Sequence, residues 1–469
     1  MARNNEPLKS YQQRVVERMM DPSLPGLVVA HGTGTGKSRT SIETIRRLGL
    51  PTNVIPPAAL QANYRKELNR WMPDGGPPVN VQSQQRVALN GLENDRRNSL
   101  LVIDEAHRAR TQGGNLMNAL VDSEAKKKLL LTATPIFNHP QDLASLVNLV
   151  ANKRLLPTDK AGFNDEYVNE KEVSPPFYQR WLGVQPGIDY ELKNQSKLRN
   201  ILNRYVDYQS GTTEGFPQVK DETIKVPMAD HQMDVYKSIM GKAPLWTQWK
   251  VKSGLPPGRG EFDSMRAFLS GARQVSNTTQ GFTTRANNVQ SPKIDRAFKY
   301  FQQQARANPR YKAVVYSNYL NSGLNAYKQQ LDRNRIPYGE FSGAVSPAVR
   351  NQMVADYNAN KLRALLVSSA GSEGLDLKGT RLVQILEPHF NEEKEKQIIG
   401  RGARYQSHAM LPTDEQNVLV QRYMAQPQAS FMDRIMGNSD VRGTDEYIRA
   451  MAQQKNRLNS QLLELMEQR

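Results

Sequence analysis

Leu100-Leu101-Val102-Ile103-Asp104-Glu105-Ala106-His107 is the stretch of this sequence that decides the fold. Its four apolar residues predict a buried strand, and two adjacent carboxylates follow that strand directly. Upstream lies a glycine-rich loop, Gly34-Thr35-Gly36-Lys37-Ser38, between an expected strand and an expected helix. A loop that cradles phosphates and an acid at a strand end that holds Mg²⁺ are the two halves of an NTPase site. The two motifs therefore predict an α/β domain that binds a nucleoside triphosphate.

Composition indicates a basic protein that works without cysteine chemistry. The 469 residues include 63 Lys and Arg against 46 Asp and Glu, which gives a net charge of +17. Such an excess favours a polyanionic partner, most simply nucleic acid, over a generally basic soluble protein. The absence of cysteine excludes disulfides, thiolate zinc sites and thiol catalysis. The six histidines show no metal-ligand spacing, and no apolar run is long enough to span a membrane. We therefore expect a soluble protein.

The alternation of short apolar runs with helical patterns divides the chain into four parts. We expect an ATP-binding lobe over 1–150, a mainly helical insertion or linker over 151–290, a second α/β lobe over 291–425 and a helical extension over 426–469. Buried-strand patterns predict parallel sheets in both lobes. They fall at residues 26–30, 53–56, 100–104, 128–132, 313–316, 364–367, 383–386 and 418–420. Helical periodicity predicts a single helix from Thr444 to Arg469.

The phosphate loop supplies the residues expected to bind nucleotide. Its glycines let backbone N–H groups wrap a phosphate, and the helix that follows adds the positive end of its dipole. Lys37 is expected to reach the β- and γ-phosphates, and Ser38 to ligate Mg²⁺. His31 stands where the strict motif has glycine. The cofactor-binding set predicted at this loop is Gly34, Thr35, Gly36, Lys37, Ser38 and Arg39.

The carboxylate pair supplies the expected catalytic acid and base. Asp104 would hold Mg²⁺, and Glu105 would orient and deprotonate the attacking water. His107 either couples this site to another lobe or is a surface histidine. Farther along, Thr132 and Thr134 end another buried strand. Hydroxyls at that place can link the acid motif to the second lobe.

The second lobe offers two arginines, Arg401 and Arg404, which would share a face if both lie on one helix. An arginine delivered from a second lobe stabilises charge on the transferring phosphoryl group. The alternative is a pair of solvated helix arginines. The Gly-rich loop upstream, residues 368–377, would touch ribose and nucleic-acid backbone, and its Asp376 joins the cofactor-binding set.

These motifs, taken in order, resemble the superfamily 2 helicases, and among them the Swi/Snf-type translocases with a DEAH box. Such proteins have two tandem RecA-like lobes. The quoted elements are Leu8–Gln12, Gly34–Ser38, Val54–Tyr64, Asp104–His107, Leu131–Asn138, Gly374–Leu377 and Gln397–Arg404. The later residues Arg404–His408, Leu411-Pro412 and Asp445–Tyr447 are similar to helicase-like ATPases of large DNA viruses and phages, including the nucleoside triphosphatase I type.

The resemblance implies a function and a fuller set of site residues. It implies a DNA motor that hydrolyses ATP with Mg²⁺, favours duplex DNA and is cytoplasmic or associated with a virus or phage. ATP would place its base near Gln12, and single-stranded DNA or RNA are possible substrates. Expected catalytic residues are Lys37, Asp104, Glu105, Gln397, Arg401 and Arg404. Expected nucleic-acid contacts are Pro56, Asn63, Ser317 and Ser368, which address the backbone rather than the bases.

Three alternatives remain at this stage. The first is a strand-separating DNA or RNA helicase, although no wedge hairpin is evident in the sequence. The second is an ATPase-silent nucleic-acid scaffold, against which the presence of Lys37, Glu105, Arg401 and Arg404 argues. The third is a small-molecule P-loop kinase, which explains neither the second lobe nor the charge.

Overall fold

The computed structural model describes residues 7–93, 97–110, 113–136, 139–181, 183–211, 214–258, 260–285, 288–342, 345–368, 376–429 and 441–467. The chain forms two compact units, each assembled from separate stretches of sequence. Unit 1 comprises residues 1–169, 190–212 and 457–469, and unit 2 comprises residues 170–189 and 213–456. The quoted Gly374, Leu375 and Asn138 lie outside the described residues.

Unit 1 is built on a six-stranded parallel sheet of order β3-β2-β4-β5-β1-β8. The four interior strands β1, β2, β4 and β5 have only buried side chains, which is typical of a parallel sheet covered on both faces. The strands are β1 (Gly26–His31), β2 (Thr52–Ile55), β3 (Val79–Val81), β4 (Leu100–Ile103), β5 (Lys127–Thr132) and β8 (Val206–Gln209).

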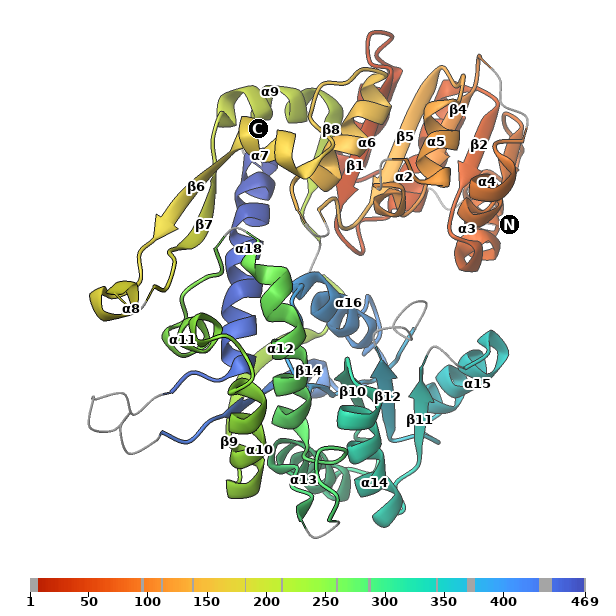
Figure 1. Cartoon of the computed structure of the whole chain (residues 1–469). Helices are drawn as coiled ribbons and strands as arrows, with labels where there is room; N and C mark the ends of the chain where they lie inside the picture. Colours follow the sequence, from red (N-terminus) through yellow and green to blue (C-terminus); the bar gives the residue numbers. More distant parts are fainter. Residues whose placement is uncertain are drawn as a thin grey trace. The chain divides into compact units, whose positions relative to one another are not determined.

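Helices flank this sheet on both faces (Figure 1). One of them, α6 (Gln141–Ala151), is apolar around most of its circumference, because it packs between β1, β5 and neighbouring helices. The others are α1 (Ser10–Met20), α2 (Lys37–Leu48), α3 (Gln61–Trp71), α4 (Gln84–Asn90), α5 (Asn115–Val121), α7 (Lys160–Tyr167) and α9 (Gln195–Tyr205).

Unit 2 repeats the plan with a six-stranded parallel sheet of order β11-β12-β10-β13-β14-β9. Its strands are β9 (Gln218–Pro227), β10 (Ala313–Ser317), β11 (Tyr338–Phe341), β12 (Ala364–Ser368), β13 (Leu382–Ile385) and β14 (Asn417–Gln426). Its helices are α10 (Asp230–Met240), α11 (Leu245–Ser253), α12 (Glu261–Asn277), α13 (Pro292–Ala307), α14 (Asn325–Arg333), α15 (Pro347–Asn358) and α16 (Glu392–Gly402). Two parallel sheets flanked by helices confirm the predicted α/β fold with two RecA-like lobes.

Two elements change unit along their length. The hairpin of β6 (Val168–Val173) and β7 (Gly187–Leu192) carries the short helix α8 (Phe177–Trp181) at its tip (Figure 1). Helix α18 (Thr444–Glu467) confirms the predicted C-terminal helix. Its first half belongs to unit 2, whereas Leu458, Leu462, Leu465 and Met466 are part of the hydrophobic core of unit 1.

All eight predicted strands are present within one or two residues of the expected bounds, except that β14 is longer. Four strands of the two sheets were not predicted: β3, β8, β9 and β11. β9 is mostly exposed and rich in charge, so its sequence lacks the apolar run of a buried strand. β8 and β9 lie in the segment expected to be mainly helical, and each completes one of the two sheets.

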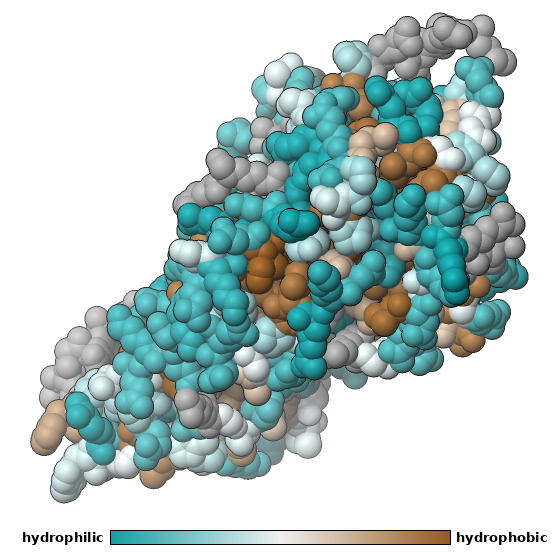
Figure 2. Space-filling model, turned by 90° about the horizontal axis from the view of Figure 1, so that it is seen from above, coloured by the Kyte–Doolittle hydropathy of each residue, from teal (hydrophilic) through white to brown (hydrophobic). Residues whose placement is uncertain are grey.

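The surface is mainly hydrophilic on the face that Figure 2 shows, and hydrophobic residues appear there in small separate groups. No helix in the described part of the chain is both long enough and apolar enough to cross a membrane.

Candidate nucleotide site

The candidate site lies along one edge of the unit 1 sheet. Strands β4, β5, β1 and β8 are neighbours and run parallel, so their carboxyl ends meet at that edge. The acid motif follows β4, the hydroxyl motif ends β5 and the phosphate loop follows β1. Ligands of open α/β sheets bind at this kind of edge. The fold therefore brings together three motifs that the sequence keeps far apart.

The phosphate loop has the backbone shape of an anion cradle. Gly34 and Gly36 have φ of 78° and 74°, in the left-handed region that glycine adopts without strain. Helix α2 begins at Lys37, directly after the loop, and so directs its N-terminus toward it. A Cβ at Gly36 would lie 2.6 Å from the Nε2 of Gln12, so this glycine also allows the approach of α1.

Lys37 lies among backbone carbonyls and carboxylates. Its Nζ donates to the carbonyl oxygens of His31 (3.0 Å) and Gly32 (3.2 Å). Burial lowers the pKa of Lys37, while the charges of Glu105 and Asp104 act in the opposite direction. The ammonium group of the phosphate loop and the carboxylates after β4 are thus electrostatic neighbours, as the motifs predict.

The remaining predicted nucleotide contacts differ in their surroundings. The Gln12 side chain donates to the carbonyl oxygen of Thr35 (2.9 Å) and accepts from the backbone N–H of Lys9 (3.0 Å), so it is fixed against the loop. The guanidinium carbon of Arg39, on α2, lies 4.0 Å from the ring centroid of Trp71, on α3. Ser38 occupies the first turn of that helix.

Asp104 is a partly buried carboxylate with an unfavourable charge. Burial, followed by repulsion from Glu105, raises its pKa to about 6. Its Oδ1 accepts the backbone N–H of Glu105 at 3.0 Å. Glu105 has φ of 50°, a left-handed conformation that is uncommon for a residue with a side chain. Such strain is typical of functional sites, because the surrounding structure must hold it in place.

His107 connects the acid motif to the end of β5. Its Nδ1 lies 3.3 Å from a carboxylate oxygen of Glu105 and 3.3 Å from the hydroxyl of Thr132. The hydroxyl of Thr132 in turn accepts the backbone N–H of Thr134 (3.1 Å). On the other side, the Gln84 amide donates to the carbonyl oxygen of Asp104 (2.6 Å). These contacts brace both carboxylate-bearing residues.

In unit 2, α16 carries Gln397 and ends at Gly402, one residue after Arg401. Arg404 therefore lies beyond the helix, so the condition under which the two arginines would share a helical face is not met. The helix ends there because Ala403, the C-cap, leaves helical geometry. Arg404 forms a 3.4 Å ion pair with Asp376, so these two predicted residues are neighbours.

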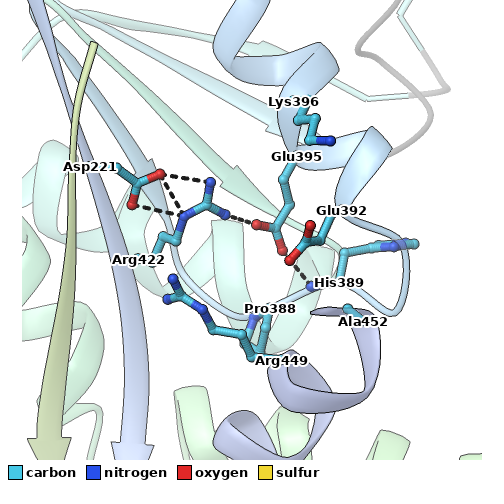
Figure 3. A pocket seen from close by; sticks show the side chains of 9 residues that line it. All are labelled: Asp221, Pro388, His389, Glu392, Glu395, Lys396, Arg422, Arg449 and Ala452. Carbon is cyan, nitrogen blue, oxygen red and sulfur yellow. Dashed lines mark hydrogen bonds and ion pairs between the residues drawn. The ribbon is translucent and has the colours of Figure 1, made fainter. Parts of the chain in front are cut away.

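A small polar pocket lies at the start of α16 (Figure 3). Arg422 of β14 bridges Asp221 of β9 and Glu395 of α16, and Glu395 also accepts the backbone N–H of His389 (2.7 Å). The cavity of about 100 Å³ contains no predicted site residue and is far below the volume of a ligand pocket. We therefore interpret the ion pairs of Arg422 as contacts that hold the start of α16 against β14, and not as a ligand site.

The four predicted nucleic-acid contacts differ in exposure. Asn63 is exposed on α3, whereas Pro56 is buried after β2. Ser317 is buried, and its hydroxyl lies 3.0 Å from each carboxylate oxygen of Glu387. Ser368 is buried, and its hydroxyl donates to the carbonyl oxygen of Phe341 (3.2 Å). The two serines thus end their strands with hydrogen bonds inside unit 2.

Sequence reasoning missed three residues near the phosphate loop: Asp207, which bonds the His31 ring, and Arg14 and Arg18, which bond Asp207. Asp207 lies in β8, far from the loop in sequence, and no motif marks it. The only signal was His31 itself, a histidine where the motif has glycine.

Comparison with known proteins shows the family to which the chain belongs. A model of the SNF2-related domain matches residues 85–281, and one of the helicase conserved C-terminal domain matches residues 293–406. The chain is 31% identical over 465 residues to a putative ATP-dependent RNA helicase, L538, of Acanthamoeba polyphaga mimivirus, covering 96% of this chain and 94% of the relative. It is 22% identical to a termination factor NPH-I homolog of African swine fever virus, covering 99% of this chain and 80% of the relative.

Among solved structures, the chain is similar to a Sulfolobus solfataricus SWI2/SNF2 ATPase core in complex with dsDNA, with 16% identity, 98% coverage of both chains and a TM-score of 0.37. The sequence relatives and domain matches place the chain in the family of SNF2-related, helicase-like ATPases that includes these viral proteins. It is an ATPase of the kind that acts with nucleic acid, and this confirms the predicted resemblance.

The raised pKa of Asp104 predicts how stability depends on pH at the site. The folded carboxyl group holds its proton up to about pH 6, whereas an ordinary Asp releases it near 3.8. Above pH 6 the folded protein therefore carries an unfavourable, partly buried charge, and Asp104→Asn removes it. We expect Asp104→Asn to raise Tm at pH 8 by about 2–4 °C per kcal/mol relieved, and the gain to vanish toward pH 4. Thermal melts at both pH values, with Asp74→Asn at an exposed site as control, measure this. Equal gains at both pH values would contradict it.

Proposed function

We propose that this protein is a motor that translocates along duplex DNA by hydrolysing ATP with Mg²⁺. The observation that carries the proposal is the meeting of Lys37, Asp104 and Glu105 at one sheet edge in a chain with an SNF2-related domain. Support for duplex DNA comes from the Swi/Snf type of the motifs, and support for a polyanion from the net charge of +17. The viral sources of the relatives favour a role in or with a virus.

The phosphate loop and α1 would bind ATP. The backbone N–H groups of residues 34–38 and the N-terminus of α2 would hold the phosphates. A phosphate oxygen would compete with the carbonyls of His31 and Gly32 for the ammonium of Lys37. Gln12 is already fixed against Thr35 and would present its amide to the base.

The residues near Asp104 fit a magnesium ion. Mg²⁺ takes one or two protein oxygens, and substrate phosphates and water complete its octahedron. Asp104 and Ser38 would supply those oxygens, and a cation would offset the burial and the repulsion from Glu105 that raise the pKa of Asp104. No cluster of three or more metal-ligating side chains occurs in the part of the chain that the structure describes. When bound, the ion would neutralise charge on the β- and γ-phosphates.

Glu105 would act as the general base. His107, which also contacts the hydroxyl of Thr132, holds the Glu105 side chain from one side, and the left-handed backbone fixes its direction. We further propose that Arg401 supplies the arginine finger for the γ-phosphate, with Gln397 and Arg404 as assisting residues and Asp376 and Arg39 near the nucleotide. Asn63, Pro56, Ser317 and Ser368 remain the proposed contacts with nucleic-acid backbone.

A second candidate function is strand separation, and the β6–β7 hairpin favours it. Helix α8 at its tip carries Phe177 and Trp181, each 82% exposed. Aromatic side chains stack on the bases of single strands, so an exposed pair on a hairpin is suited to separate a duplex. The sequence did not reveal this hairpin, because β6 and β7 are short and mostly polar.

The first test measures ATPase rate with no nucleic acid, single-stranded DNA, duplex DNA and single-stranded RNA, with Lys37→Ala as control. We expect duplex DNA to stimulate most strongly, because the proposed motor follows a duplex, and triplex displacement is the matching translocation assay. Stimulation by single strands alone, with unwinding of forked duplexes, would favour the helicase instead. Activity no higher than that of Lys37→Ala would refute both.

The assigned base predicts a separation of binding from hydrolysis. Glu105→Gln keeps the size of the side chain and one acceptor oxygen but cannot take a proton from water. We expect ATP and DNA binding within about twofold of wild type and hydrolysis lower by about 10² or more. A fluorescent ATP analogue and a phosphate-release assay measure the two. The control is Glu124→Gln, which makes the same change at an exposed carboxylate of unit 1 and should behave as wild type. Normal turnover of Glu105→Gln would show that Glu105 is not the general base.

The proposed arginine finger predicts a loss of rate without loss of affinity. We expect Arg401→Ala to bind ATP nearly as wild type and to hydrolyse it about 10³-fold more slowly, because the guanidinium stabilises charge that appears only in the transition state. Lys396→Ala removes an exposed cation from the same helix and serves as control. A change smaller than threefold in Arg401→Ala would show that this arginine has another role.

A further inference from the structure

A buried carboxylate beside the phosphate loop collects three side chains from two elements. Asp207 of β8 has no exposed surface. Its two oxygens accept from Nε and Nη2 of Arg14 (2.9 and 2.8 Å) and from Nη1 of Arg18 (3.0 Å). The Nε2 of His31 lies 2.9 Å from one of them. We call these four residues the Asp207 hub.

The charges of the hub fix how His31 is bonded. Two arginines stabilise the ionised form of Asp207, so the ring nitrogen facing it carries the proton and donates. Burial lowers the pKa of His31, so the ring is neutral at pH 7. The Nδ1 is then an acceptor, and among the described residues it has no hydrogen-bond partner. The ring also contacts Tyr11 edge-on at 5.6 Å, so it is held on more than one side.

His31 is also part of the nucleotide site. It ends β1, and its carbonyl oxygen accepts from the ammonium of Lys37. The position of the hub therefore sets the position of a backbone group that binds the phosphate-contacting lysine. Helix α1, which supplies Arg14 and Arg18, reaches the loop a second time through Gln12 and Thr35. The loop is thus held to α1 at both of its ends.

Strand β8, which carries Asp207, is the last strand of unit 1 before the chain enters unit 2. The carbonyl oxygen of Gln209, at the end of β8, accepts the backbone N–H of Gly32 (2.9 Å). A Cβ on Gly32 would lie 2.4 Å from the backbone nitrogen of Gly211, so the two backbones are in direct contact. The chain passes from unit 1 to unit 2 after residue 212. A shift of Gly32 would therefore require the backbone at Gly211 to move as well.

We propose that Asp207 and His31 are positioning residues that set the phosphate loop for ATP and tie it to α1 and to the connection that leaves unit 1. This inference rests on the proposed ATPase function and deepens it. Neither side chain is assigned a contact with the substrate: Asp207 holds the His31 ring, and the carbonyl oxygen of His31 accepts from Lys37. A purely structural hub would contribute to stability alone, whereas a positioning hub also changes the affinity for ATP.

The first experiment compares Asp207→Asn with Asp445→Asn. Asp445 is an equally buried carboxylate, paired with Lys293 at 2.6 Å in unit 2, and so controls for lost stability. We expect both variants to lower Tm, but only Asp207→Asn to raise KM for ATP, by about tenfold or more, because a misplaced loop binds phosphates poorly. The kcat of Asp207→Asn at saturating ATP should remain within about threefold of wild type. An unchanged KM in a folded Asp207→Asn protein would overturn the proposal.

A second experiment uses the atom that bonds to Asp207 and does not require Asp207→Asn to fold. The side-chain nitrogen of Gln occupies nearly the place of histidine Nε2, whereas that of Asn lies closer to the backbone, near Nδ1. We expect His31→Gln to keep KM within about threefold of wild type. His31→Asn and His31→Leu, which cannot donate at that distance, should raise it by about tenfold. Equal KM values for the Gln and Leu variants would overturn the proposal.

Failure of this inference is distinguishable from failure of the proposed function. Each variant is also titrated with a fluorescent ATP analogue beside wild type and Lys37→Ala. If wild type binds no more tightly than Lys37→Ala, the ATPase assignment is wrong. If wild type binds and the hub variants bind equally well, the ATPase assignment stands and the hub is only structural.

Discussion

The parallel direction of the strands in unit 1 is the constraint on which the site depends. Because β4, β5, β1 and β8 all run the same way, the segments that follow them meet at one edge. Each contributes one kind of chemistry: carboxylates after β4, a hydroxyl on β5, the phosphate loop after β1 and the buried Asp207 within β8. An antiparallel strand in this group would place its functional residue at the opposite edge.

The site brings together three residues, each of which has an unfavourable charge or an unfavourable backbone conformation. Asp104 carries a raised pKa, Lys37 a lowered one, and Glu105 a left-handed backbone. Neighbouring groups hold them in place: Gln84 bonds the carbonyl oxygen of Asp104, His107 contacts Glu105, and two backbone carbonyls accept from Lys37. Strain at such a place is offset by the apolar core beneath it, which packs all six strands.

Local pattern was enough to predict the interior strands and the motifs at their ends. Short apolar runs such as those of β4 and β10 are typical of buried strands. The loop Gly34–Ser38 needs positive φ angles at two positions, and both positions are glycine. Edge strands were not predictable in this way, since β9 is exposed and charged and pairs with β14 from far along the chain. Asp207 was missed for a related reason: its partners lie about 180 residues away in sequence and come together only in the folded protein.

The course of α18 has a consequence for how the protein is made. Most of unit 1 precedes unit 2 in the chain and so leaves the ribosome earlier, yet its hydrophobic core includes Leu458, Leu462 and Leu465. The core of the nucleotide-binding unit is therefore incomplete until all of unit 2 has been synthesised. Until then, the part of the unit 1 core that packs against the end of α18 remains uncovered. A nascent chain halted before residue 457 thus carries every motif of the ATP site on an unfinished lobe, which makes it a natural client for chaperones.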